Sequence, residues 1–163
     1  MNEVSTSKTN NVLRRVVRKI VVLSLIGCAA LITLSMTASR PPGLGLHGGK
    51  LAPVPDSPNC VSSMTEKSAA AIEPFDVSGI EQPMDELKKV IESTIPRARL
   101  VTEQDNYLHY EFTSSLFRFV DDSEFLLDAE RNVIHFRSAS RVGYSDMGAN
   151  RKRMEKIRTA LGK

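Results

Sequence analysis

Cysteine is scarce in this chain of 163 residues, which contains two cysteines and no tryptophan. Cys28 lies within a long apolar run and Cys60 lies outside it, so we expect no disulfide bond between them. No histidine or basic residue is near Cys60 in the sequence. Since such a neighbour is what activates a thiol, we expect Cys60 to be a small buried residue rather than a reactive one.

Signatures of catalysis and of cofactor binding are also absent from the sequence. It contains no glycine-rich phosphate-binding loop and no residues with the spacing of metal ligands. Ser138 and Ser140 have no histidine identifiably placed to activate them, and His47 stands alone among glycines. We therefore predict no cofactor and no metal ion, and we rank an enzymatic role below a structural or binding role.

Basic residues are concentrated near the N-terminus rather than spread along the chain. The net charge is +3, but residues 1–19 hold five Lys and Arg against one acidic residue. From Leu51 onward the chain has 15 Lys and Arg against 18 Asp and Glu. The part expected to fold therefore lacks the basic footprint of a nucleic-acid-binding domain, and we predict no nucleic-acid partner.

An uncharged run of 17 residues, Ile20–Met36, follows the basic cluster Arg14–Lys19. A helix of about 20 apolar residues spans a bilayer, and the preceding apolar residues extend this one to that length. We predict a transmembrane or signal helix over 12–38, which meets the membrane through residues 12–36, after a disordered cytoplasmic tail over 1–11. Because basic flanks stay in the cytoplasm, we expect an inner-membrane protein with its soluble domain in the periplasm or otherwise outside the cytoplasm.

Three fates of the apolar segment stay open. It can be a retained anchor, or a signal cleaved near Thr37–Ser39, where small residues flank the site. Leu25–Cys28 also resembles a bacterial lipobox, in which Cys28 would be lipidated. Residues 29–36 stay apolar, however, where a mature lipoprotein usually has a polar tether. All three fates place the C-terminal domain on the same side of the membrane.

Beyond the apolar segment, the composition divides the chain into a linker and a domain. Residues 39–58 are rich in proline and glycine and have no sustained period, which predicts an extended tether. Residues 59–163 are predicted to form a soluble α+β domain, in which residues 64–76 are weakly patterned and irregular.

The regular elements of this domain follow from periodicity and from proline. An apolar stripe predicts a helix over 82–93, with Pro83 in its first turn and Pro96 beyond its end. Strands are predicted at 97–103, 107–115, 117–128 and 132–142, followed by a helix over 150–161 with Asn150 as its N-cap. The fold is therefore a four-stranded antiparallel meander with two helices packed on one face. Alternation along the second strand predicts that His109 faces solvent.

Charges of both signs interrupt the apolar pattern of the last two strands and continue into the final helix. The candidate ligand-binding residues are Asp121, Asp122, Glu124, Arg137, Arg141, Asp146, Asn150, Arg151 and Arg153. A turn centred between Glu130 and Arg131 places Glu124 opposite Arg137. Asp122 shares a face with Glu124, and Asp121 points to the other face.

Three interpretations of these charges stay open. Arg151–Arg153 occupy the first turn of the last helix, where the helix dipole disfavours cations, so a compensating partner is expected. An ion-pair network between the final helix and the acidic strand would supply it. Alternatively, Arg137, Arg141 and Arg151 could form an anion site with the free N–H groups of the helix. The third interpretation is a cation site formed by four carboxylates, Asp121, Asp122, Glu124 and Asp146.

Four segments together resemble a known family. They are Ser57–Ser63 (Ser-Pro-Asn-Cys-Val-Ser-Ser), Phe119–Glu124, Arg137–Arg141 and Gly148–Arg153. These match motifs of a bacterial and plastid family, the domain of unknown function 1499. Where that family usually has a first cysteine this chain has Val54, so a pairing of that cysteine with Cys60 does not operate here. The resemblance implies a fold and a location but no reaction, since the activity of the family is unassigned.

Taken together, the sequence predicts a membrane-tethered protein of the cell envelope with a structural or interaction role. Two alternatives remain: an envelope domain that binds a small anion or a divalent cation, and an envelope enzyme that uses the Asp/Glu/Arg cluster. The expected partners are the membrane and either another envelope protein or a small anion.

Overall fold

The computed structural model describes residues 3–162, with side-chain positions from Leu13 onward. It contains an N-terminal helix, a six-stranded antiparallel sheet and two further helices. In chain order the elements are α1 (Glu3–Thr37), β1 (Cys60–Ser62), β2 (Phe75–Asp76), α2 (Pro83–Thr94), β3 (Ala98–Gln104), β4 (Tyr107–Thr113), β5 (Val120–Asp128), β6 (Val133–Ser140) and α3 (Ala149–Ala160).

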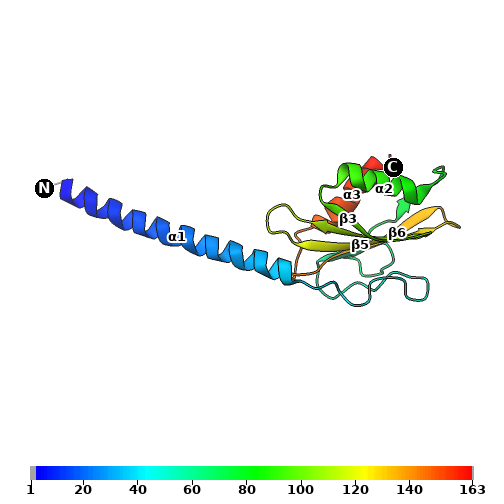
Figure 1. Ribbon diagram of the computed structural model, residues 1–163, viewed down its shortest axis with the longest axis horizontal. Coiled ribbons are helices and arrows are strands. Elements are labelled where there is room, and N and C mark those ends of the chain that lie inside the picture. Colours follow the sequence, from blue (N-terminus) through cyan, green and yellow to red (C-terminus); the bar gives the residue numbers. More distant parts are fainter. Residues whose placement is uncertain (1–2, 163) are drawn as a thin grey trace.

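Helix α1 is continuous and projects away from one end of the domain (Figure 1). Within the described residues it is the one helix long and apolar enough to cross a membrane, over Leu13–Thr37, and a signal sequence would have the same character. The helix begins at Glu3, so it includes residues that the sequence predicted to be a disordered tail; Met1 and Asn2 lie outside the described residues. No proline interrupts the chain before Pro41, so nothing in the tail ends the helix.

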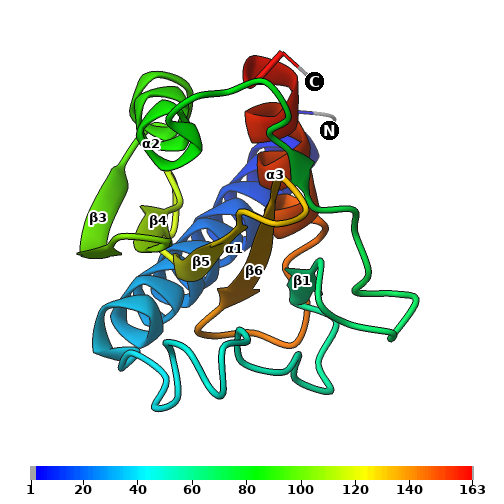
Figure 2. The ribbon, with the colours of Figure 1, turned by 90° about the vertical axis from the view of Figure 1, so that its right-hand side faces the viewer.

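The sheet has the strand order β1-β6-β5-β4-β3, and every pairing is antiparallel. Figure 2 shows these strands side by side in this order. The four predicted strands are present as a meander, and Glu124 pairs with Arg137 as the centred turn predicted. The prediction of four strands was incomplete, because β1 and β2 both add to the free edge of β6. Strands of three and two residues are too short to show a period of two in the sequence.

Both short helices cover the same face of the sheet, as predicted (Figures 1 and 2). Pro83 begins α2, Asp85 and Glu86 complement the positive end of its dipole, and its buried stripe faces the sheet. The core between helices and sheet is aromatic, with the rings of Phe75 and Phe136 4.4 Å apart. Its fully buried members include Phe75, Leu87, Ile91, Leu108, Tyr110, Phe112, Phe125, Ile134, Phe136, Met154 and Ile157.

The proline- and glycine-rich segment does not hang free between α1 and the domain. It runs along the sheet face opposite the helices (Figure 1, cyan). Leu51 is buried there against Tyr107 and Leu126. The backbone N–H of Gly45 donates to Glu124, 2.6 Å away. Residues 39–58 lack helix and strand, as expected from their composition, but they form the third layer of the domain.

Candidate functional site

The sheet face beneath this segment is polar and charged. We call it the charged face, and it consists of His109, Glu111, Asp122, Glu124, Arg137 and Arg141. Antiparallel register brings these residues together, because His109 pairs with Glu124, Glu111 with Asp122, and Glu124 with Arg137. Most of these side chains are buried. A buried charge is tolerated only with partners, so the contacts of each group decide what the face can do.

Arg141 lies at the centre of one half of the charged face. Its Nε and Nη2 atoms donate to the two carboxylate oxygens of Asp122, at 2.7 Å each. Nη2 also donates to Glu111. His109 approaches the same carboxylate, with Nε2 2.8 Å from Oδ1 of Asp122. The hydrogen bonds that Arg141 donates to Asp122 raise the pKa of Arg141, so the guanidinium stays charged. This half of the face is a closed ion-pair network.

Glu111 draws two further arginines into that network. Arg40, in the segment that follows α1, donates to it at 2.7 Å, and Arg99 on β3 donates to its other oxygen. Burial would raise the pKa of Glu111, but the hydrogen bonds from Arg40, Arg141 and Arg99 outweigh it and lower the pKa from 4.5 to about 2. In Asp122, burial is likewise outweighed by hydrogen bonds from Arg141 and His109, and its pKa is lowered.

His109 does not face solvent as its place in the strand predicted. Only 3% of the surface of His109 is exposed to solvent. Alternation along β4 correctly separates two faces, but the segment over 39–58 covers the second face, so every residue of β4 except Thr113 is buried. Sequence reasoning also missed Glu111, Arg99 and Arg40. The register between β4 and β5 places Glu111 beside Asp122, and the longer loop between these strands does not fix that register in the sequence.

The other half of the charged face is incompletely satisfied. Glu124 is fully buried, and its Oε1 atom accepts hydrogen bonds from Tyr107 Oη at 2.9 Å and from Gly45 N at 2.6 Å. Its Oε2 atom lies 3.6 Å from Nη1 of Arg137. Among the described residues, neither of these two atoms has a hydrogen-bond partner. Glu124 and Arg137 attract each other electrostatically, but Oε2 of Glu124 can still accept a hydrogen bond and Nη1 of Arg137 can still donate one.

A cavity of about 310 Å³ adjoins Arg137 on the covered face. Its wall comes from the segment after α1, and its lining residues are Pro41, Pro42, Gly43, Leu44, His47, Ala52, Pro53 and Arg137. Arg137 is the one lining residue with a permanent charge, and it is 8% exposed. Its Nε atom donates to the carbonyl oxygen of Pro53 at 3.3 Å.

A second polar cluster lies on the helix face of the sheet. Arg153 of α3 donates to Asp121 at 2.6 Å and to Oδ1 of Asn150 at 2.7 Å, and it stacks over the ring of Phe112. Ser138 donates to the same Asn150 oxygen at 2.6 Å. Asn150 is completely buried, and its side-chain amide nitrogen donates to Asn59 O at 3.1 Å. These contacts join the final helix to the sheet and to the segment before β1.

The cationic first turn of α3 now has a physical explanation. Asp146 accepts hydrogen bonds from Gly148 N at 2.9 Å and from Asn150 N at 2.8 Å, which supplies an anion at the positive helix end. Arg151 donates to the carbonyl oxygens of Ala69 and Ala71. The predicted N-cap was wrong: the N-cap is Gly148, in the left-handed conformation at φ 77°, and Asn150 turns inward.

The nine candidate residues therefore fall into separate groups instead of one site. Asp122, Glu124, Arg137 and Arg141 share the charged face, while Asp121, Asn150 and Arg153 lie on the helix face and Asp146 and Arg151 at the start of α3. The four carboxylates considered for a cation site are divided among all three places. Within residues 3–162, no group of three or more His, Cys, Asp and Glu side chains could hold a metal ion.

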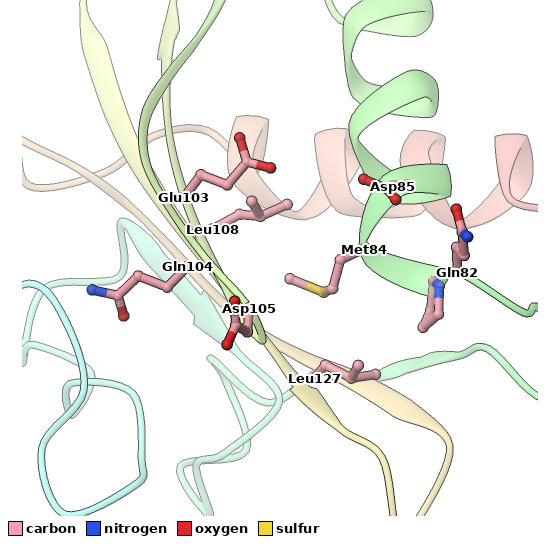
Figure 3. A pocket seen from close by; sticks show the side chains of 9 residues that line it. Gln82, Met84, Asp85, Glu103, Gln104, Asp105, Leu108 and Leu127 are labelled. Carbon is pink, nitrogen blue, oxygen red and sulfur yellow. The ribbon is translucent and has the colours of Figure 1, made fainter.

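Other features of the structure offer less chemistry. Cys60 is buried, and burial raises the pKa of its thiol to about 11, which leaves it unreactive near neutral pH. A groove of about 480 Å³ lies between the start of α2 and the β3–β4 hairpin. Figure 3 shows the side chains that line it. Of the three carboxylates that line it, Asp85 and Glu103 both pair with Lys88, and the third belongs to Asp105 in the β3–β4 turn.

The fold is thus an α+β domain built on a meander sheet, and its sequence places it in a defined family. The sequence profile described as "Protein of unknown function (DUF1499)" matches residues 50–161. The chain belongs to this family, as its motifs predicted. No curated protein and no solved structure matches the chain.

Replacing Arg141 by alanine is expected to lower the free energy of unfolding by about 3–5 kcal/mol, because it leaves two buried carboxylates without their shared cation. Arg131→Ala is the matched control, since Arg131 is exposed and pairs only with Asp128, 3.6 Å away. The control should cost about 0–1 kcal/mol. Urea unfolding of the full chain in detergent, followed by circular dichroism, measures both. Equal costs for the two variants would contradict a central role for Arg141.

The acid stability of the domain should depend on Glu111. Its folded pKa of about 2 is below the ordinary 4.5, so the charge contributes stability above about pH 4.5 and loses this contribution as the pH falls towards 2. Glu111→Gln should therefore lower the free energy of unfolding by about 1–3 kcal/mol at pH 7, and the deficit should shrink to zero near pH 2. Urea unfolding across this range measures the deficit. Glu130→Gln, in the exposed β5–β6 turn, should stay close to the parent protein at every pH.

Proposed function

We propose that this protein is a single-span membrane protein whose DUF1499 domain is held against the outer surface of the cytoplasmic membrane, in a structural or interaction role. The observation that carries the proposal is the junction between α1 and the domain. Ser35 lies in the last turn of the apolar helix, is buried, and donates from Oγ to the carbonyl oxygen of Arg118 at 2.5 Å. The end of the span is therefore part of the folded domain.

The orientation follows from the charges that flank the span. Arg14, Arg15, Arg18 and Lys19 precede or begin the apolar run, and positively charged flanks are retained in the cytoplasm. The domain then lies on the opposite side, in the periplasm where the cell has two membranes. The domain lies on this side of the membrane whether the helix is retained, cleaved or lipidated.

A retained helix agrees best with the junction. Cleavage near residues 37–39 would remove Ser35 and leave the Arg118 carbonyl without its hydroxyl donor. Lipidation of Cys28 would leave a short apolar helix, residues 29–37, between the lipid and the domain. We therefore propose the retained anchor as the mature form.

A non-catalytic role is supported by how the charges are used. Arg141 pairs with both Asp122 and Glu111, Glu111 also pairs with Arg40 and Arg99, and Arg153 is bound to Asp121. Ser138 donates to Asn150 and is in contact with Ser123, so its hydroxyl is held by amide and hydroxyl groups rather than by a base. Charges that satisfy one another stabilise a fold, whereas an active site keeps groups available to a substrate.

Fusion of an enzymatic reporter after the C-terminal residue tests location and processing together. A reporter that is active only outside the cytoplasm should be active, and the intact mass of the purified protein should include residues 1–37. Cys28→Ala should leave that mass lower only by the cysteine-to-alanine difference. Activity of a cytoplasm-only reporter would contradict the orientation, and a mass beginning near Ser39 would contradict the retained anchor.

A second candidate function, binding of a small anion, is favoured by the Arg137 half of the charged face. Arg137 lines the 310 Å³ cavity, whereas Glu124 does not line it. The proposed anion would approach Arg137 from the cavity, on the side away from Glu124, whose Oε2 atom lies 3.6 Å from Nη1 of Arg137. Guanidinium groups bind carboxylates and phosphates through paired hydrogen bonds, which identifies these two classes as the ligands to test.

Inorganic phosphate and acetate are the probes for this second function. Each should raise the melting temperature of the full chain, equivalent to about 1.4 kcal/mol at a tenfold excess over Kd, beyond the effect of sodium chloride at equal ionic strength. Arg137→Ala should abolish the rise, and Arg131→Ala should retain it. An unchanged melting temperature with both anions would contradict anion binding and leave the anchored structural role in place.

A further inference from the structure

Three large apolar side chains of the domain are unusually exposed. Leu116, Tyr144 and Met147 are 72%, 77% and 90% exposed. Among the described residues after α1, the next large apolar side chains, Leu46 and Met64, reach only 38% and 37%. Singly exposed apolar residues need no explanation, so the question is whether these three share one surface.

The three residues belong to two loops at the same end of the sheet. Leu116 lies in the β4–β5 loop, 114–119, and the other two lie in the β6–α3 loop, 141–148. The loops leave the sheet side by side, because Arg141 N at the end of β6 donates to Val120 O at the start of β5. This is also the end of the sheet that meets α1, as Figure 1 shows.

The β4–β5 loop is firmly closed, which holds Leu116 outward. Ser114 N donates to Phe119 O at 2.8 Å, and Phe119 N donates back to Ser114 Oγ at 2.9 Å. The rings of Phe117 and Phe119 pack together with centroids 5.8 Å apart. Leu116 is therefore presented at the tip of a braced loop and is directed away from the core.

The end of the membrane span is fixed to this same loop. Ser35 binds the carbonyl oxygen of Arg118, and α1 ends at Thr37, so two residues separate this contact from the helix end. At 1.5 Å per helical residue, that distance is about 3 Å. The domain has no free tether that would let this end of the sheet move away from the bilayer.

We infer that the loop tips carrying Leu116, Tyr144 and Met147 form a membrane-contacting surface that enters the interfacial layer of the bilayer. The inference rests on the proposed anchoring and adds the lipid surface as a second contact of the domain. Aromatic and aliphatic side chains with neighbouring cations are typical of interfacial contacts. Exposed Arg118 and Arg97 flank the first loop and would meet anionic headgroups.

Site-specific fluorescence in nanodiscs of mixed neutral and anionic phospholipids tests this inference. An environment-sensitive fluorophore is attached to the full chain at Leu116→Cys, with Glu130→Cys in the opposite β5–β6 turn as the control, both in a Cys28→Ala background. Cys60 is buried, so it does not compete for the label. Native Cys28, labelled in the unsubstituted chain, reports on the span itself with lipids that carry the spin label deep in the acyl chain, because Cys28 is nine residues, about 14 Å, from the end of α1.

The probe at Leu116→Cys should shift to shorter wavelength and be quenched several-fold more than the Glu130→Cys probe by lipids with a spin label near the headgroup. Equal, weak quenching at both positions, with Cys28 still strongly quenched, would overturn the membrane-contacting surface and leave the anchor intact. A shift without lipid quenching would indicate a protein contact and would also overturn it. Weak quenching of Cys28 by the lipids labelled deep in the acyl chain would contradict the anchor itself.

Discussion

The hydrogen bonds that Arg141 donates to the buried carboxylates of Asp122 and Glu111 are the interaction on which the charged face and the segment covering it depend. A sheet face that carries such charges cannot be packed by an apolar layer, because each charge needs hydrogen bonds as well as a partner. The segment over residues 39–58 meets this need with a guanidinium from Arg40 and a backbone N–H from Gly45. A segment with the composition of a flexible linker thereby becomes the layer that covers the charged face.

The same segment determines how the domain is joined to α1. It begins directly where α1 ends and is packed on the sheet from Arg40 onward, so no slack remains between span and domain. One end of the sheet is consequently fixed to the end of α1, and the groove between α2 and the β3–β4 hairpin lies towards the other end. In the proposed anchored form, the first end would lie next to the bilayer and the groove would be the part of the domain farther from it.

The spacing of apolar residues in the sequence predicted the two short helices and the central strands. Each of these elements is long enough for its apolar residues, which face one core, to repeat at a recognisable period. The pairing of Glu124 with Arg137 was predictable as well, since a short hairpin turn fixes its own register. The two edge strands were missed, because two or three residues carry no period. His109 was misassigned for a different reason: burial of a second sheet face by an irregular segment leaves no periodic trace. The grouping of the candidate residues into separate clusters likewise depends on contacts between segments distant in sequence.

Hydrogen–deuterium exchange of the full chain in nanodiscs tests the central claim most directly, namely that residues 39–58 are a packed layer of the domain. The amide of Gly45, which donates to buried Glu124, should be protected at a level comparable with the amides of β5. Protection should fall in Arg141→Ala, which disrupts the network beneath the segment. Exchange of the whole segment at the rate of an unfolded chain, while β5 stays protected, would contradict the account.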